Sequence, residues 1–170
     1  FGEWKTRQLP GPIDALEVAF NGREFINNDM TPIKMGSMGY RTVASGHKDQ
    51  LTLELAVELL TNNSKTGLID HLQIEGELQQ VGIYNMSFVD HGGVNFFFFP
   101  LQGTQTLNDA EILVKQQIEK LKNGDFDDTF FNAVKVTMTR QHEENIENME
   151  GRLFNLIDIY IKDSSWKNII

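Results

Sequence analysis

Apolar residues recur along this chain with two different spacings, and these spacings divide it into predicted strands and helices. Alternating or continuous apolar runs are typical of strands, and they occur at residues 15–20, 34–43, 81–89 and 94–101. Apolar residues spaced three and four apart are typical of helices, and they occur at residues 48–62, 67–79, 107–124, 130–138 and 153–161. The stretch from 140 to 150 is polar.

Two turn signals organise the predicted strands. Asn21-Gly22 is a strong two-residue hairpin signal, so residues 23–26 are predicted to return as a strand. Asp90-His91-Gly92-Gly93 separates the last two predicted strands and indicates a second β-hairpin. Because strands and helices are grouped and do not alternate, the pattern predicts an α+β fold. We expect a mostly antiparallel sheet with helices packed on one face, which is a two-layer sandwich.

Several helix ends have recognisable sequence signals. Thr106-x-x-Asp109 resembles a capping box, although Asp replaces the usual Glu or Gln. Asn123-Gly124 is a typical helix stop, and Asp125 or Asp127 is predicted to cap the next helix. Ser45 or His47 is predicted to cap the helix over residues 48–62.

The predicted strand 94–101 is apolar on both faces. Phe96 and Phe98 point one way and Phe97 and Phe99 the other, whereas a half-exposed sheet would alternate apolar and polar residues. Strand aromatics usually pack under helices, so part of this cluster is expected in the core. The remaining pair then lies under the N-terminal strands, meets a partner outside the domain, or serves as a platform for a peptide.

Composition and charge exclude several classes of protein. The chain has 170 residues, which suits one ordinary domain, and a formal net charge of −9. That charge argues against nucleic acid as a partner, because phosphate contacts need clustered Lys and Arg. The longest apolar run is too short to span a bilayer, so no membrane insertion is expected. Cys is absent, which excludes disulfides and thiolate chemistry and leaves the compartment open.

No motif in the sequence forms a recognisable catalytic or metal site. His71 and Glu75 lie four residues apart on a predicted helix and share a face, but two ligands are too few for a zinc site. The run starting at His142 would need His at position 146 to match a zincin motif, and that residue is Ile146. Neither a phosphate-binding loop nor a nucleophile elbow is present. We therefore expect neither a catalytic residue nor a metal ligand in this chain.

Short motifs and their order resemble the pitrilysin/insulinase family of zinc metallopeptidases. The first helical region matches the family pattern in Gly46-His47-Lys48-Asp49, in Leu51-x-Leu53-x-Leu55-Ala56-x-x-Leu59-Leu60 and in Gly67-Leu68-Ile69. A hairpin, a helix ending in Leu121-Lys122-Asn123-Gly124 and a helical pair follow in the family's order. Phe1-Gly2-Glu3-Trp4 is similar to the segment that closes one domain of such proteins before the linker to the next.

One departure from the family pattern decides what the resemblance implies. Active domains of this family carry His-x-x-Glu-His on the first long helix, and this chain has no such motif. The resemblance therefore implies the family's non-catalytic domain, which forms one wall of the chamber that encloses the peptide substrate. The resemblance also implies that this chain is part of a longer parent protein, whose separate catalytic domain holds zinc. It implies no cofactor in this chain. We expect residues 1–14 to be an interdomain linker and residues 15–170 a single domain, cut short at its C-terminal end.

The expected partners are other domains of the same chain or a paired subunit, and a peptide substrate; self-association is a further expectation. Candidate residues for substrate or interdomain contact are Tyr40, Arg41, Phe96, Phe97, Phe98 and Phe99. Two alternatives stay open: a stand-alone peptide- or protein-binding module that uses the Phe-rich sheet face, and an unrelated enzyme whose site assembles in space. A periplasmic or cell-envelope location would follow only if the parent is an exported bacterial peptidase.

Overall fold

The computed structural model describes residues 22, 24–26 and 32–161, and it divides into a unit of residues 1–32 and a unit of residues 33–170. The second unit contains all the helices and strands of the described residues. The strand predicted at 15–20 lies outside the described residues. Of the return strand predicted at 23–26, residues 24–26 are described and have no strand structure.

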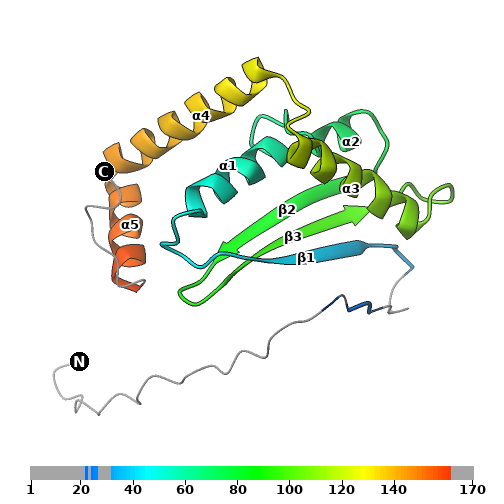
Figure 1. The fold of residues 1–170 in the computed structure, drawn as a ribbon, viewed down its shortest axis with the longest axis horizontal. Coiled ribbons are helices and arrows are strands. Elements are labelled where there is room, and N and C mark those ends of the chain that lie inside the picture. The colour runs from blue at the N-terminus through cyan, green and yellow to red at the C-terminus, as the bar shows by residue number, and fades with distance from the viewer. Residues whose placement is uncertain (1–21, 23, 27–31, 162–170) are drawn as a thin grey trace, which may run out of the picture. The chain divides into compact units, whose positions relative to one another are not determined.

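Three antiparallel strands form the sheet, in the order β1-β3-β2 (Figure 1). They are β1 (Gly36–Thr42), β2 (Gln80–Ser87) and β3 (Gly92–Phe99). The predicted hairpin is confirmed, but its turn comes earlier than expected, at residues 88–91. The Phe88 N–H donates to the His91 carbonyl oxygen (2.8 Å), and Ser87 pairs with Gly92. The two glycines assigned to the turn are therefore the first residues of β3, because the ladder continues to them.

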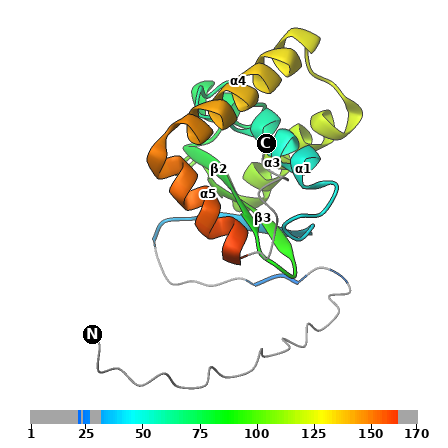
Figure 2. The same cartoon turned by 90° about the vertical axis from the view of Figure 1, so that its left-hand side faces the viewer.

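Helices cover one face of this sheet, as Figures 1 and 2 show. Helix α1 (Gln50–Leu60) contacts β2, α3 (Leu107–Asn123) contacts β1 and β3, and the short α2 (Asp70–Ile74) contacts β2. The buried core between these layers consists of Leu60, Ile69, Leu72, Leu78, Val81, Val94, Phe96, Phe98, Ala110 and Val114. The α+β class, the antiparallel sheet and the placement of helices on one face are thus as predicted.

The ends of α3 follow the sequence signals, and the start of α1 does not. The Thr106 Oγ1 accepts from the Asp109 N–H (3.2 Å) and the Asp109 Oδ2 accepts from the Thr106 N–H (3.0 Å), which completes the capping box. Gly124 ends α3 in the left-handed conformation, with φ +67°. At the start of α1, neither Ser45 nor His47 caps the helix. Instead the Gln50 Oε1 accepts from the Gly46 N–H (2.6 Å).

The second predicted helix, 67–79, is largely irregular, because a buried carboxylate organises the chain around it. Asp70 is only 3% exposed. Its two carboxylate oxygens accept hydrogen bonds from the Thr61 hydroxyl (2.9 Å) and from the backbone N–H groups of Asn62 and Gly67 (3.1 Å each). The Lys65 ammonium lies 3.4 Å from the same carboxylate. These bonds fix the segment between α1 and α2, so its apolar residues reach the core without a long helix.

Two further helices complete the described chain. Helix α4 (Asp128–Glu147) is capped by Asp127, whose Oδ1 accepts from the Thr129 N–H (2.6 Å), as one of the two predicted capping residues. It contacts α1 and is followed by α5 (Met149–Ile161), which contacts α4. The polar stretch 140–150 is therefore helical almost throughout. Among the residues that the structure describes, no helix combines the length and hydropathy needed to cross a membrane.

Candidate functional site: the open face of the sheet

The four consecutive phenylalanines of β3 divide between the two faces of the sheet. Phe96 and Phe98 point toward the helices and are core residues, 4% and 3% exposed. Phe97 and Phe99 point to the opposite face, where they are half-buried, and no described helix covers that face (Figure 1). Of the four predicted contact residues in β3, only Phe97 and Phe99 can thus reach a partner from this face, which we name the open face.

Register places a second group of side chains beside these two phenylalanines. Gly82 pairs with Phe97 and Tyr84 with Asn95, and Met86 pairs with Gly93, so all point to the open face. Tyr84 and Phe97 have ring centroids 5.8 Å apart. A Cβ on Gly82 would lie 2.3 Å from the Phe97 ring, so this glycine lets the ring lie flat across β2. The open face therefore has an aromatic centre at β2 and β3.

Tyr40 and Arg41 are neighbours in β1 and point to opposite faces. Tyr40 pairs with Val94 and contacts Phe96 edge-on, with ring centroids 5.7 Å apart, so it lies on the side of the helices. Arg41 pairs with Gly93, which places it on the open face. It is the only charged residue in the three strands, and no strand contains Asp or Glu.

Tyr84 and Met86 are members of the open face that the sequence reasoning did not single out. Both are substantially exposed. A signal was present, because Gly82, Tyr84 and Met86 alternate with Val81, Ile83 and Asn85 in a predicted strand, and alternate residues share a face. The missing information was the pairing of β2 with β3, which brings that face next to Phe97.

The described residues do not form a set of side chains that fits a zinc ion. Within the described part of the chain, no group of three or more His, Asp or Glu side chains is placed to hold a metal. His71 and Glu75 do approach each other, with 3.9 Å between Nδ1 and Oε1, but both are exposed and no third ligand joins them. Catalytic zinc needs three protein ligands.

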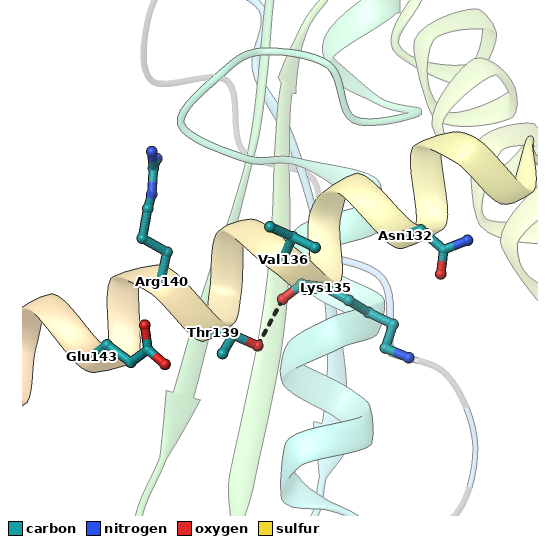
Figure 3. A pocket seen from close by; sticks show the side chains of 6 residues that line it. All are labelled: Asn132, Lys135, Val136, Thr139, Arg140 and Glu143. Carbon is teal, nitrogen blue, oxygen red and sulfur yellow. Dashed lines mark hydrogen bonds between the residues drawn. The ribbon is translucent and has the colours of Figure 1, made fainter.

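Two hollows lie on the helical side, and neither has the features of a reactive site. One, of about 380 Å³, is formed by side chains of α4 alone, where the Thr139 hydroxyl donates to the Lys135 carbonyl oxygen (3.0 Å) (Figure 3). The other, of about 220 Å³, lies between α4 and the end of α1, and Glu58 lines it. Burial, and secondarily the charge of Asp70, raises the pKa of the Glu58 carboxyl.

Comparison with known proteins connects this geometry to one family. Residues 1–138 match the family described as Peptidase M16 inactive domain. A solved structure described as a protease from Helicobacter pylori has the same fold, with a TM-score of 0.67 and 21% sequence identity over 80% of this chain. This chain spans 33% of that protease chain. A search of curated proteins gave no match. The match over residues 1–138 covers most of the sequence, and the chain therefore belongs to the family of M16 peptidase inactive domains.

Proposed function

We propose that this chain is the non-catalytic domain of a zinc-dependent peptidase and forms one wall of the chamber that encloses the peptide substrate. In this proposal a separate domain with a His-x-x-Glu-His motif, in the same chain or in a paired subunit, holds the zinc ion and performs the cleavage. Family membership supports the non-catalytic role, and the lack of a zinc-binding set among the described residues agrees with it.

The observation that carries the proposal is the open face of the sheet. A wall that accepts many peptides must contact their side chains and backbone without repelling either sign of charge. Phe97, Phe99, Tyr84 and Met86 offer a broad apolar and aromatic surface, which is typical of interaction sites. None of the three strands contributes a carboxylate to this face, in a chain of net charge −9.

A binding assay with the full 170-residue chain tests this role. The probe is a fluorescein-labelled, unstructured synthetic peptide rich in Leu and Phe, and the readout is its fluorescence anisotropy. We expect binding without cleavage, with or without added zinc. Tyr84→Ser should weaken binding about tenfold, which corresponds to 1.4 kcal/mol. The matched control is Val136→Ser, which removes an equally exposed apolar side chain from α4 and should leave binding unchanged.

Two outcomes would overturn the proposal. Cleavage of the probe by the chain alone would show an active enzyme. Binding that responds to Val136→Ser and not to Tyr84→Ser would place the peptide on the helices. The sequence that flanks this chain in its gene provides an independent check. A parent protein and paired subunits that all lack His-x-x-Glu-His would exclude the catalytic partner.

A further inference from the structure

The hollow between α4 and the end of α1 contains a carboxylate that the described part of the chain leaves without a partner. Glu58 lines this hollow and is half-buried. Among the residues that the structure describes, its carboxylate oxygens accept no hydrogen bond and form no ion pair. The charge that acts on it is that of Asp70, which has the same sign. The hollow therefore lacks a cation at a place where a carboxylate is partly removed from water.

The cation on the neighbouring loop is already engaged. The Lys65 ammonium lies 3.4 Å from the Asp70 carboxylate, which also accepts from the Thr61 hydroxyl and from two backbone N–H groups. The charge of Asp70 is thus compensated within the chain, and that of Glu58 is not. All other residues that line the hollow are neutral, so the positive charge that Glu58 lacks has to come from outside the described residues.

Neutral hydrogen-bonding groups surround Glu58 in the hollow. Asn63 and Ser64 line it from the segment after α1, and Thr137 and Gln141 line it from α4. Among the described residues, none of these four side chains takes part in a hydrogen bond within the chain, so their amide and hydroxyl oxygens are available. The lining also includes the ring of Phe130. These groups together suit a ligand that has several N–H donors and a flat face.

A guanidinium group has these properties more fully than other common cations. It is planar, presents five N–H donors, pairs with a carboxylate through two parallel hydrogen bonds and stacks on aromatic rings. An ammonium group is compact and strongly hydrated, so it gains less from an aromatic wall. A metal ion would lack ligands, because no group of three or more His, Asp or Glu occurs among the described residues.

We propose that the hollow between α1 and α4 binds a guanidinium group, with Glu58 as its counter-ion. The neutral side chains of the lining accept its other N–H groups, and the Phe130 ring lies against its flat face. The hollow has a volume of about 220 Å³, which accommodates several water molecules or one group of this size. An Arg side chain of a polypeptide and a small free guanidino compound both present this group.

This inference goes beyond the proposed function and does not depend on it. The hollow lies on the helical side of the domain, whereas the proposed peptide surface is the open face of the sheet. Guanidinium binding needs neither the open face nor a zinc-bearing domain. Each of the two proposals can therefore fail while the other holds.

Nuclear magnetic resonance of the nitrogen-15-labelled, full 170-residue chain tests the binding. The main probe is the peptide Gly-Arg-Gly with both ends capped, and the matched control replaces Arg by citrulline, whose neutral urea group has a similar shape. We expect shifts of the Asn63 and Thr137 backbone amides with a Kd of about 1 mM for the Arg peptide. The citrulline peptide should bind at least about tenfold more weakly, and the corresponding Lys peptide several-fold more weakly.

Ethylguanidinium chloride distinguishes the two sources of the group. Binding of the Arg peptide at least as tight as that of ethylguanidinium would identify a polypeptide side chain as the ligand. Binding of ethylguanidinium alone would identify a small free molecule. Both outcomes support a guanidinium site. Shifts confined to the open face would overturn it, as would the absence of shifts with either probe at about 50 mM.

Substitution of Glu58 tests its role as the counter-ion. Glu58→Gln keeps the shape of the side chain, so the fold should survive, which circular dichroism checks. It should weaken binding of the Arg peptide at least about tenfold. The matched control is Glu54→Gln, one turn earlier on α1, where a half-buried carboxylate accepts from the Gln50 side chain and does not line the hollow. Unchanged binding by Glu58→Gln, or equal binding of the Arg and citrulline peptides, would overturn the proposal.

The titration of Glu58 provides a readout that a merely structural role would not change. A bound guanidinium favours the ionised carboxylate, so saturation with the Arg peptide should lower the Glu58 pKa in carbon-13 spectra. The lining from α4 contains no ionisable group, and Asp70 keeps its Lys65 partner in both states. An unchanged Glu58 pKa would contradict the ion pair. Tyr84→Ser should leave binding of the Arg peptide unchanged, and Glu58→Gln should leave binding of the labelled Leu- and Phe-rich peptide unchanged, which separates this site from the open face.

Discussion

Replacing Phe98 and Phe97 separately by Ala measures how differently the two faces of the sheet are covered. The two residues are adjacent in β3, share a residue type and differ only in the face to which they point. Phe98 lies in the core, at 3% exposure, in contact with the layer of helices. Phe97 is half-buried on the open face, beside Tyr84.

The expected losses follow from burial. Fully burying a Phe side chain is worth about 2–3 kcal/mol in transfer free energy. Removing one from an enclosed core adds a cavity term, so Phe98→Ala should lower the free energy of unfolding by about 3–5 kcal/mol. The open face encloses no cavity around Phe97, and about half of its transfer term is lost, so Phe97→Ala should cost about 1 kcal/mol.

Urea denaturation followed by circular dichroism at low protein concentration measures both losses. Low concentration keeps the chain monomeric, so that association does not contribute. The difference between the two variants should then exceed about 2 kcal/mol, with unchanged denaturant dependence. Equal losses, or a larger loss for Phe97→Ala, would show that both faces are covered. That result would refute the open face and everything inferred from it.

Four further predictions concern Thr106 and Asp109 of the helix cap, the Glu58 carboxyl in the hollow between α1 and α4, and zinc. Thr106→Ala should lower the free energy of unfolding by about 1 kcal/mol in thermal melts, because it removes the N-cap of α3. Hydrogen bonds from the Thr106 hydroxyl and backbone lower the pKa of the Asp109 carboxyl. The ionised carboxylate therefore stabilises the fold above its unfolded pKa, and this contribution is lost as pH falls through the lowered folded pKa. Asp109→Asn should be destabilising at neutral pH and neutral in strong acid. The pKa of the Glu58 carboxyl is raised, so the fold favours its protonated form. This stabilising contribution is present below the unfolded pKa and is lost as pH rises through the folded pKa. Glu58→Gln, which cannot ionise, should therefore stabilise the chain at pH 7 and not in acid. Elemental analysis of protein purified without a His tag should give well under one zinc per chain, and a full equivalent that is lost on His71→Ala would contradict the absence of a site.

Local signals predicted those parts of the fold that local interactions determine. The capping box at Thr106 and the stop at Gly124 set the bounds of α3, because both act within one helical turn. The start of α1 was missed, because no described side chain accepts from the first backbone N–H groups of this helix; the Gln50 side chain accepts from the Gly46 N–H, which precedes the helix. The irregular segment around Asp70 was also missed, since its carboxylate accepts from residues three to nine positions earlier and no periodicity reports that.

The candidate site depends on strand pairing, which the local pattern of apolar residues in the sequence does not reveal. Four consecutive phenylalanines look the same from both faces, so alternation alone cannot say which pair is buried. Pairing with Val81 and Ile83 of β2 places Phe98 and Phe96 on the side of the core. The same register brings Tyr84 to the open face. The two-sided character of β3 was therefore predictable, and the identity of its exposed side was not.

The order β1-β3-β2 has a consequence for how this chain behaves when it is handled alone. Among the described residues, β1 and β2 each have a single strand neighbour, so each leaves a row of backbone groups available for another strand. Natural edge strands are usually protected by Lys, Pro or inward-pointing charges, and Arg41 is the only such residue in either strand. Strand addition at these edges does not close, in contrast to a two-fold pair, so it leads to open-ended polymers. Handled alone, the chain is therefore open to fibrillar aggregation at its sheet edges.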